Sequence, residues 1–254
     1  IHLDHKTIAF KDVVGTGKKE INFSEVDLKN AKNYAAEDAD ITFRLYQKFK
    51  KSLKTEKMIN IYEIFEKPMI KILAFMEIEG IKINNKFLKT LSSKFEKKIL
   101  KIQDEVFKIS KKEFNIASPK QLGEIIYNDL KIANLKKTKK GSFATSASVL
   151  EDLAFKGHKF PQLVLDWRQL SKLKNTYTDS LPEHINSKTN RVHTSFLLAA
   201  TTTGRLASSD PNLQNIPIKS EDGKDIRKAF TAKKGHLLIS ADYNQIEMRI
   251  LADL

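Results

Sequence analysis

The sequence has 254 residues, 41% of them hydrophobic and 30% charged, and it has no cysteine, which excludes disulfides and thiolate metal sites. The absence of cysteine fits a reducing compartment, and neither a membrane-spanning apolar run nor a signal-peptide layout is visible. The net charge of +14 fits a polyanionic partner, with nucleic acid ahead of an anionic membrane, and it equally fits a lysine coat that only confers solubility.

Helical spacing dominates the first half of the chain. One helix is expected from about Asp27, with Ser24 or Asp27 as its cap, and a second helical stretch runs from Ile59 to Gly80, a natural terminator. A third, long helix is expected after Asn84 or Asn85, either of which can cap it. Its apolar residues recur in steps of three and four, which predicts a packed seam. The seam consists of Leu88, Leu91, Phe95, Ile99, Ile102, Val106 and Ile109.

The middle of the chain continues with shorter helices. Residues 118–121, Ser-Pro-Lys-Gln, predict a helix start with a serine cap and a capping box. A basic loop follows at 135–143, and Thr145 or Ser146 can cap the next helix. Another helix is expected over 163–173.

The last quarter is richer in β-formers and turns. Residues 191–196 predict a strand, 201–217 an irregular segment, and 237–241 a buried strand that leads to Asp242. Helical periodicity resumes at Gln245.

Four motifs carry candidate chemistry, and residues 239–250 are the most specific. Asp242 follows an apolar strand and precedes a helix, where a hard divalent cation could reach its carboxylate. Helix capping is the competing interpretation of this aspartate.

The second motif, residues 203–217, is a loop rich in arginine, asparagine and glutamine. Such side chains can reach minor-groove acceptors that every base pair presents, or they can satisfy the loop's own backbone. In the third, Arg168 and Lys172 lie four residues apart on one helix face, either to contact phosphates or as a solvated face. In the fourth, Tyr34 and Asp38 share a helix face.

Together these motifs resemble those of bacterial family A DNA polymerases, over essentially the whole chain. The resemblance implies that Asp242 is a catalytic aspartate, the first of two that bind metal. Tyr243, Gln245 and Glu247 belong to the same signature at the nucleotide site, and Glu247 resembles the glutamate that crowds a ribonucleotide 2′-hydroxyl.

The resemblance also assigns the DNA contacts. Arg205 resembles the contact to the primer terminus. The implied duplex and template contacts are Asn212, Gln214 and Asn215. Arg168 and Lys172 are implied phosphate contacts of a thumb domain, and the basic loop at 136–141 its tip. Lys219 stands where the family has an arginine, so the positive charge is kept but the planar guanidinium, which can make two parallel hydrogen bonds, is lost.

Residues 34–38 resemble the last motif of a proofreading 3′–5′ exonuclease domain. By that resemblance Tyr34 positions the attacking water and Asp38 binds metal, whereas Glu37 and Asp40 fall on other faces, where we expect them to be solvated.

The implied fold is α+β and mostly helical, with an exonuclease-tail helix, long antiparallel thumb helices and the first strands of an antiparallel palm sheet. We expect the end of the exonuclease domain over 1–55, the thumb over 56–182 and the beginning of the palm over 183–254.

The implied function is that of a DNA-directed DNA polymerase of replication and repair in the cytoplasm, at the bacterial nucleoid. Its implied cofactor is Mg²⁺, its partners are primer–template DNA and deoxynucleoside triphosphates, and we expect a monomer that does not associate with membranes. Because the chain starts at Ile1 and stops at Leu254 within a helical pattern, we expect an internal piece. The resemblance requires a fingers helix and a second palm aspartate beyond Leu254, and further exonuclease carboxylates before Ile1, so we expect this piece to have no activity of its own. The alternative is a non-catalytic DNA-binding module derived from a polymerase.

Overall fold

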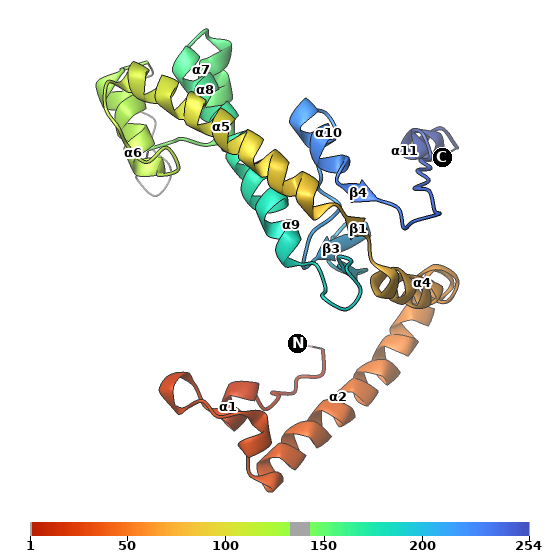
Figure 1. The fold of residues 1–254 in the computed structure, drawn as a ribbon. Coiled ribbons are helices and arrows are strands. Elements are labelled where there is room, and N and C mark those ends of the chain that lie inside the picture. The colour runs from red at the N-terminus through yellow and green to blue at the C-terminus, as the bar shows by residue number, and fades with distance from the viewer. Residues whose placement is uncertain (1, 133–142, 254) are drawn as a thin grey trace. The chain divides into compact units, whose positions relative to one another are not determined.

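The computed structural model describes residues 2–132 and 143–253, which fall into two compact units, 1–74 and 75–254 (Figure 1). The α-helices are α1 (Phe10–Val14), α2 (Leu28–Thr55), α3 (Ile59–Ile61), α4 (Lys67–Glu79), α5 (Asn85–Ser110), α6 (Pro119–Glu124), α7 (Ala147–Phe155), α8 (Lys159–Leu173), α9 (Ser180–Glu183), α10 (Glu221–Arg227) and α11 (Ile246–Asp253). Short 3₁₀ turns are η1 (Gly17–Lys19) and η2 (Phe23–Glu25), and π-helical segments are η3 (Tyr62–Glu66), η4 (Ile125–Asp129) and η5 (Lys174–Asp179). The strands are β1 (Lys82–Ile83), β2 (Ser195–Leu197), β3 (Ala207–Ser209) and β4 (Phe230–Thr231).

The mostly helical α+β fold predicted from the sequence is confirmed. The predicted domain boundaries near residues 55 and 182 stay predictions. In the part of the chain that the structure describes, none of the helices is both long and apolar enough to span a bilayer.

The first unit is organised around α2. Asp27 caps this helix, because its carboxylate accepts hydrogen bonds from the backbone N–H of Lys29 at 3.1 Å and of Asn30 at 3.4 Å. The rings of Phe10 and Phe23 lie 5.9 Å from each other and 5.9 Å from the ring of Tyr34 on α2. This aromatic cluster holds the N-terminal segment against α2.

The second unit is built on the packing of α5 against α8 (Figure 1). Asn84 caps α5 by accepting a hydrogen bond from the backbone N–H of Phe87 at 3.1 Å. Five residues of the predicted seam are buried on α5, among them the completely buried Phe95, whereas Ile102 and Ile109 are half-buried. Truncation of such a phenylalanine to alanine typically costs about 3–5 kcal/mol of stability.

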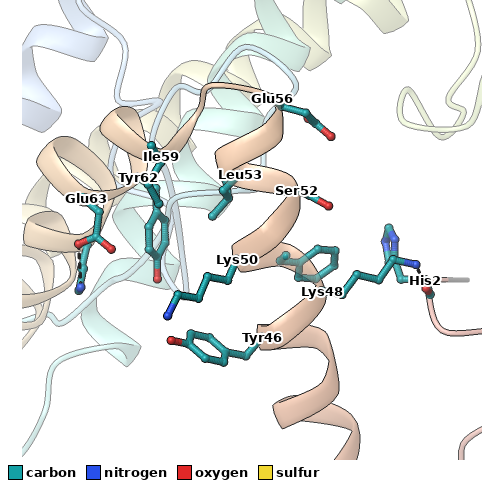
Figure 2. Close-up of a pocket in the computed structure, with 12 residues that line it drawn as sticks. His2, Tyr46, Lys48, Lys50, Ser52, Leu53, Glu56, Ile59, Tyr62 and Glu63 are labelled. Atoms are coloured by element: carbon teal, nitrogen blue, oxygen red, sulfur yellow. Dashed lines mark hydrogen bonds and ion pairs between the residues drawn. The ribbon is translucent and has the colours of Figure 1, made fainter.

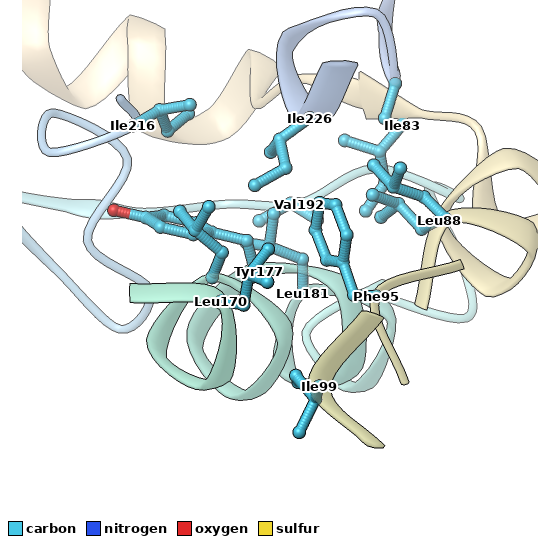
Figure 3. Packing of buried hydrophobic residues seen from close by; sticks show 13 residues of the cluster. Ile83, Leu88, Phe95, Ile99, Leu170, Tyr177, Leu181, Val192, Ile216 and Ile226 are labelled. Carbon is cyan, nitrogen blue, oxygen red and sulfur yellow. The ribbon is translucent and has the colours of Figure 1, made fainter. Parts of the chain in front are cut away.

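The seam runs through two hydrophobic clusters. The first joins α5 to the end of α8, to η5 and to residues from distant segments, among them Val192, Ile216 and Ile226 (Figure 3). The second lies farther along α5 and joins it to α6, η4, α7 and α8. Ile216 of the first cluster belongs to the loop rich in amides, so this loop is anchored in the core.

The predicted helix start at Ser118 is confirmed, but its capping box is only half formed. Ser118 accepts a hydrogen bond from the backbone N–H of Gln121 at 3.4 Å. The Gln121 side chain instead accepts from the backbone N–H of Asn115 at 2.7 Å. Its amide therefore fixes the approach to the helix rather than the cap residue itself.

The strand predictions for the last quarter are partly wrong. Of residues 191–196, only the end enters β2, while Val192 forms an isolated bridge to Ile81. β3 lies inside 201–217, which the sequence predicts as irregular, and pairs antiparallel with β2. β1 and β4 form the other antiparallel pair.

Residues 237–241 do not form the predicted buried strand. Leu237 is 87% exposed and Ile239 is 90% exposed. A strand that is apolar on both faces is stable only inside a sheet whose two faces are covered. None of the described strands pairs with residues 237–241. The helix predicted from Gln245 is present as α11.

Gly80 ends α4 in a left-handed conformation, with φ of +59°. A Cβ atom here would lie 2.5 Å from the Val192 carbonyl oxygen and 2.7 Å from His193 Nδ1. Glycine therefore permits a close approach, in which Arg191 donates to the carbonyl oxygens of Glu79 at 2.6 Å and Gly80 at 2.9 Å. This contact ties the end of α4 to the segment that leads into β2.

Candidate nucleic-acid interface

The loop that follows β3 alternates between buried and exposed residues. Leu213 and Ile216 pack into the first hydrophobic cluster. The three amide residues predicted to contact DNA, Asn212, Gln214 and Asn215, are all exposed. The apolar pair thus anchors the loop while the amides face solvent.

Asn212 is partly engaged within the loop. Its Oδ1 accepts hydrogen bonds from the backbone N–H of Gln214 at 3.0 Å and of Asn215 at 3.3 Å. The Ser208 hydroxyl accepts from the backbone N–H of Leu213 at 3.0 Å. The Asn212 oxygen therefore satisfies backbone groups of its own loop, which is the second of the two interpretations open from the sequence, while its contact to DNA stays a prediction.

A hollow of about 500 Å³ lies between two of these amide residues, Asn212 and Asn215, and the end of α8 with η5. It is lined by Gln169, Lys172, Leu173, Thr176, Tyr177, Asn212, Asn215 and Pro217. The structure therefore brings Lys172, Asn212 and Asn215, three of the predicted DNA contacts, to one hollow. Its polar lining consists of amide and hydroxyl side chains, which can both donate and accept hydrogen bonds, and of one positive charge, which suits phosphates.

Arg168 lies apart from this hollow. Its guanidinium NH1 donates to the carbonyl oxygen of Thr145 at 2.8 Å, just before α7. Burial lowers the pKa of Arg168 from its usual range, consistent with a guanidinium drawn into the protein. In this arrangement Arg168 ties α8 to the start of α7, and Lys172 alone presents its charge at the hollow.

Arg205 and Glu247 come together from distant parts of the sequence. Arg205 NH2 lies 3.0 Å from Glu247 Oε1, and the side chains are 76% and 72% exposed. An ion pair this exposed contributes little stability, typically less than about 1 kcal/mol. It nevertheless places the predicted primer contact beside the predicted nucleotide-site glutamate.

Asp242, Tyr243 and Gln245 are exposed residues in the segment before α11, and Lys219 is exposed elsewhere in the unit. Asp242 supplies one carboxylate, but no three potential ligands of the His, Asp, Glu or Cys type gather anywhere in the described residues. The described residues therefore do not fit a complete Mg²⁺ site by themselves.

In the first unit, Tyr34 belongs to the aromatic cluster and Asp38 is exposed on the same helix. The expectation that Glu37 is solvated is wrong. Its carboxylate contacts His5 Nε2 at 2.7 Å and accepts from the backbone N–H of Ile8 at 2.6 Å, and these hydrogen bonds lower the pKa of Glu37. Asp40 is exposed as expected, 3.4 Å from Arg44.

A larger hollow of about 950 Å³ lies in the first unit, between the end of α2 and η3 (Figure 2). The Lys50 Nζ lies 5.5 Å from the centre of the Tyr46 ring, and Lys67 pairs with Glu63 at 2.8 Å. None of the residues predicted to be functional lines this hollow. The basic loop at 136–141 lies outside the described residues.

Three residues that hold the amide loop in place were missed from the sequence. The Thr194 hydroxyl lies 3.0 Å from the carbonyl oxygen of Ser209 and 2.8 Å from that of Pro211. Tyr177 and Arg227 bind carbonyl oxygens farther along the loop. Contacts of this kind join side chains to a distant backbone and leave no spacing pattern in the sequence.

Comparison with known proteins identifies the family of the chain. The model of DNA polymerase family A matches residues 85–254. The chain belongs to DNA polymerase family A. A second model, described as 3′–5′ exonuclease, matches residues 3–54 of this family A chain.

Relatives of this family A chain include polymerases from distant bacteria. DNA polymerase I of Rhizobium leguminosarum is 48% identical over 98% of this chain and 25% of its own length. The thermostable DNA polymerase I of Thermus thermophilus is 43% identical over 87% of this chain and 27% of its own length. The chain thus spans about a quarter of the length of these curated relatives.

A solved structure resembles the fold. The POL domain of Pol1 from M. smegmatis, in complex with a DNA primer–template and dNTP, matches with a TM-score of 0.71 and 38% identity. The match covers 80% of this chain and 35% of that one.

Proposed function

We propose that this chain is part of a DNA-directed DNA polymerase of replication and repair, and that its second unit binds the primer–template duplex. The observation that carries the proposal is the hollow in which Lys172 faces Asn212 and Asn215. The similar M. smegmatis domain, whose complex contains a primer–template, supports it.

The chemistry of the hollow suits duplex DNA of any sequence. Amide donors from Asn212 and Asn215 in the hollow, and from the exposed Gln214 between them in the loop, can reach the minor-groove acceptors that A·T and G·C pairs share. Lys172 can neutralise a backbone phosphate and release a condensed counterion. Arg205 pairs with Glu247 at 3.0 Å, and we propose that the primer terminus meets the incoming nucleotide there.

For the segment before α11 and the start of that helix, we propose a role in catalysis and nucleotide binding. Asp242 is proposed as a catalytic aspartate, with Tyr243, Gln245 and Glu247 at the site of the deoxynucleoside triphosphate. Mg²⁺ is the proposed cofactor of the whole polymerase; Asp242 would supply one oxygen ligand to it.

We further propose that the first unit belongs to a 3′–5′ proofreading domain. The exonuclease model over residues 3–54 supports this, and Tyr34 and Asp38 are the proposed catalytic and metal-binding residues. The polymerase would act as a monomer at the bacterial nucleoid, in the cytoplasm.

The test is equilibrium binding of a fluorescent primer–template by the 254-residue chain over a series of salt concentrations. We expect affinity to fall steeply with salt, and Lys172→Gln to reduce the slope of log K against log[salt] by about 0.9. Lys156→Gln, which removes an exposed lysine at the end of α7, is the matched control and should leave the slope unchanged. Absent binding, or an affinity independent of salt, would overturn the proposal.

A further inference from the structure

Three successive carbonyl groups of the amide loop are bound by only two side chains. The Tyr177 hydroxyl donates to the carbonyl oxygen of Asn215 at 2.5 Å. Arg227 donates from NH2 to the carbonyl oxygen of Ile216 at 3.0 Å and from Nε to that of Pro217 at 3.3 Å. The backbone at the end of the loop is therefore fixed from two sides.

Tyr177 approaches from the hydrophobic core. It lies on η5 and is 4% exposed, and Figure 3 shows its ring among the buried side chains with the hydroxyl oxygen directed outward from them. Burial raises the pKa of Tyr177, so the hydroxyl keeps its proton and remains a donor at neutral pH. Its ring fixes the hydroxyl because it has no room to rotate away.

Arg227 approaches from α10, and several contacts place this short helix. Lys94 and Lys98 on α5 pair with α10 carboxylates, Lys94 with Asp225 at 3.0 Å and Lys98 with Asp222 at 2.7 Å.

Gly223 brings α10 close to the loop. A Cβ atom at Gly223 would lie 2.7 Å from Pro217 Cβ and 2.8 Å from the Pro217 carbonyl oxygen. The missing side chain thus lets α10 come within reach of the carbonyl groups that Arg227 binds. The planar guanidinium then offers two parallel donors, which a lysine could not supply from one ammonium with the same geometry.

We propose that Tyr177 and Arg227 are positioning residues that hold the amide loop in its DNA-binding conformation. The inference rests on the proposed duplex binding by this loop. With the three carbonyl groups bound inward, the Gln214 and Asn215 side chains stay on the exposed face. Binding DNA then requires little further ordering of the loop, and this lowers the entropic cost of association.

Direct phosphate contact is the competing role for Arg227, because the residue is exposed. The two roles differ in what they require. A phosphate contact requires the positive charge, whereas positioning requires the forked pair of donors. Charge-preserving and charge-removing variants therefore separate them.

The experiment measures primer–template binding by the 254-residue chain across a salt series. The variants are Arg227→Lys, Arg227→Gln and Tyr177→Phe, with Lys224→Gln as a control that removes an exposed charge from the same helix. We expect both Arg227 variants and Tyr177→Phe to bind about tenfold more weakly, which corresponds to the loss of roughly one hydrogen bond. The salt slope of the Arg227→Gln variant should match that of Lys224→Gln.

Two results would overturn the inference while the proposed function stands. One is wild-type affinity in Arg227→Lys; the other is a salt slope about 0.9 lower in Arg227→Gln than in the control, the sign of a lost phosphate contact. Absent duplex binding by the wild-type chain would instead overturn the proposed function and the inference with it. Tyr177 lies on η5 rather than on α10, so the Tyr177→Phe variant tests the positioning role even if an Arg227 variant misfolds.

Discussion

Replacing Thr194 by valine tests whether the start of the amide loop is held by a single hydroxyl. Thr194 is 7% exposed, and its hydroxyl lies 3.0 Å from the carbonyl oxygen of Ser209 and 2.8 Å from that of Pro211. Valine has nearly the same shape but no donor. The change therefore leaves these carbonyl groups without the hydroxyl, at a cost of about 1–3 kcal/mol.

The assay is amide hydrogen exchange in the loop, measured on Thr194→Val and on the matched control Thr194→Ser. Serine keeps the hydroxyl and loses one methyl group, so it disturbs packing by about 0.8 kcal/mol while preserving the hydrogen bonds. In the valine variant we expect exchange at the Leu213 amide to rise about tenfold or more, since 1.4 kcal/mol corresponds to a factor of ten. Unchanged exchange in the valine variant, or an equal rise in both variants, would refute this reasoning.

Three further predictions concern the elements around the loop. Hydrogen bonds from Lys228 and Lys94 lower the pKa of Asp225, so its contribution to stability is present above about pH 4 and is lost as the pH falls through its folded pKa. The protection factors of the α10 amides, which are corrected for the slower intrinsic exchange at low pH, should accordingly fall in acid for the wild type, and an Asp225→Asn variant that shows the same acid response would contradict this. Gly80→Ala should lower the free energy of unfolding of the second unit in denaturant by about 2–3 kcal/mol. The control is Gly157→Ala, where roughly 1–2 kcal/mol is expected because Gly157 has φ of +89° but open space around it. Equal losses would argue against the close approach at Gly80. Arg168→Met should cost about 1.5–3 kcal/mol of stability, because the hydrogen bond to the Thr145 carbonyl oxygen is lost. The salt dependence of DNA binding should stay unchanged. A reduced salt slope with intact stability would instead support the phosphate contact predicted from the sequence.

The elements that could be predicted from the sequence are those whose signal is local. Asp27, Asn84 and Ser118 each cap the helix that their position predicts. The apolar spacing of α5 marks its buried face, because a helix presents residues three and four apart on one side. Gly80 ends its helix with a positive φ for an equally local reason.

Long-range contacts could not be predicted in the same way. The buried strand expected over 237–241 fails because its apolar residues require neighbours on both faces, and the described strands pair elsewhere. Glu37 looked like a solvated residue by its helix face, yet it accepts hydrogen bonds from His5 and Ile8, about thirty positions earlier in the chain. Only the folded chain shows such partners.

For the candidate site, too, the residue types could be predicted from the sequence, whereas their contacts could not. Motif resemblance named the amides of the loop and Lys172, and the structure places Lys172, Asn212 and Asn215 around one hollow. The motif resemblance did not reveal that Asn212 uses its side-chain oxygen inside the loop, or that Arg168 binds a carbonyl group away from the hollow. Residue type predicts which groups can donate, whereas the backbone decides where each donor points.

The most direct test of the central claim is a hydrogen-exchange footprint of primer–template DNA on the chain. If the second unit binds the duplex through the hollow, protection should appear in the loop over 212–217 and around Lys172 to Thr176, and it should weaken as salt is raised. Protection confined to the first unit, or an unchanged exchange pattern at saturating DNA, would contradict the account.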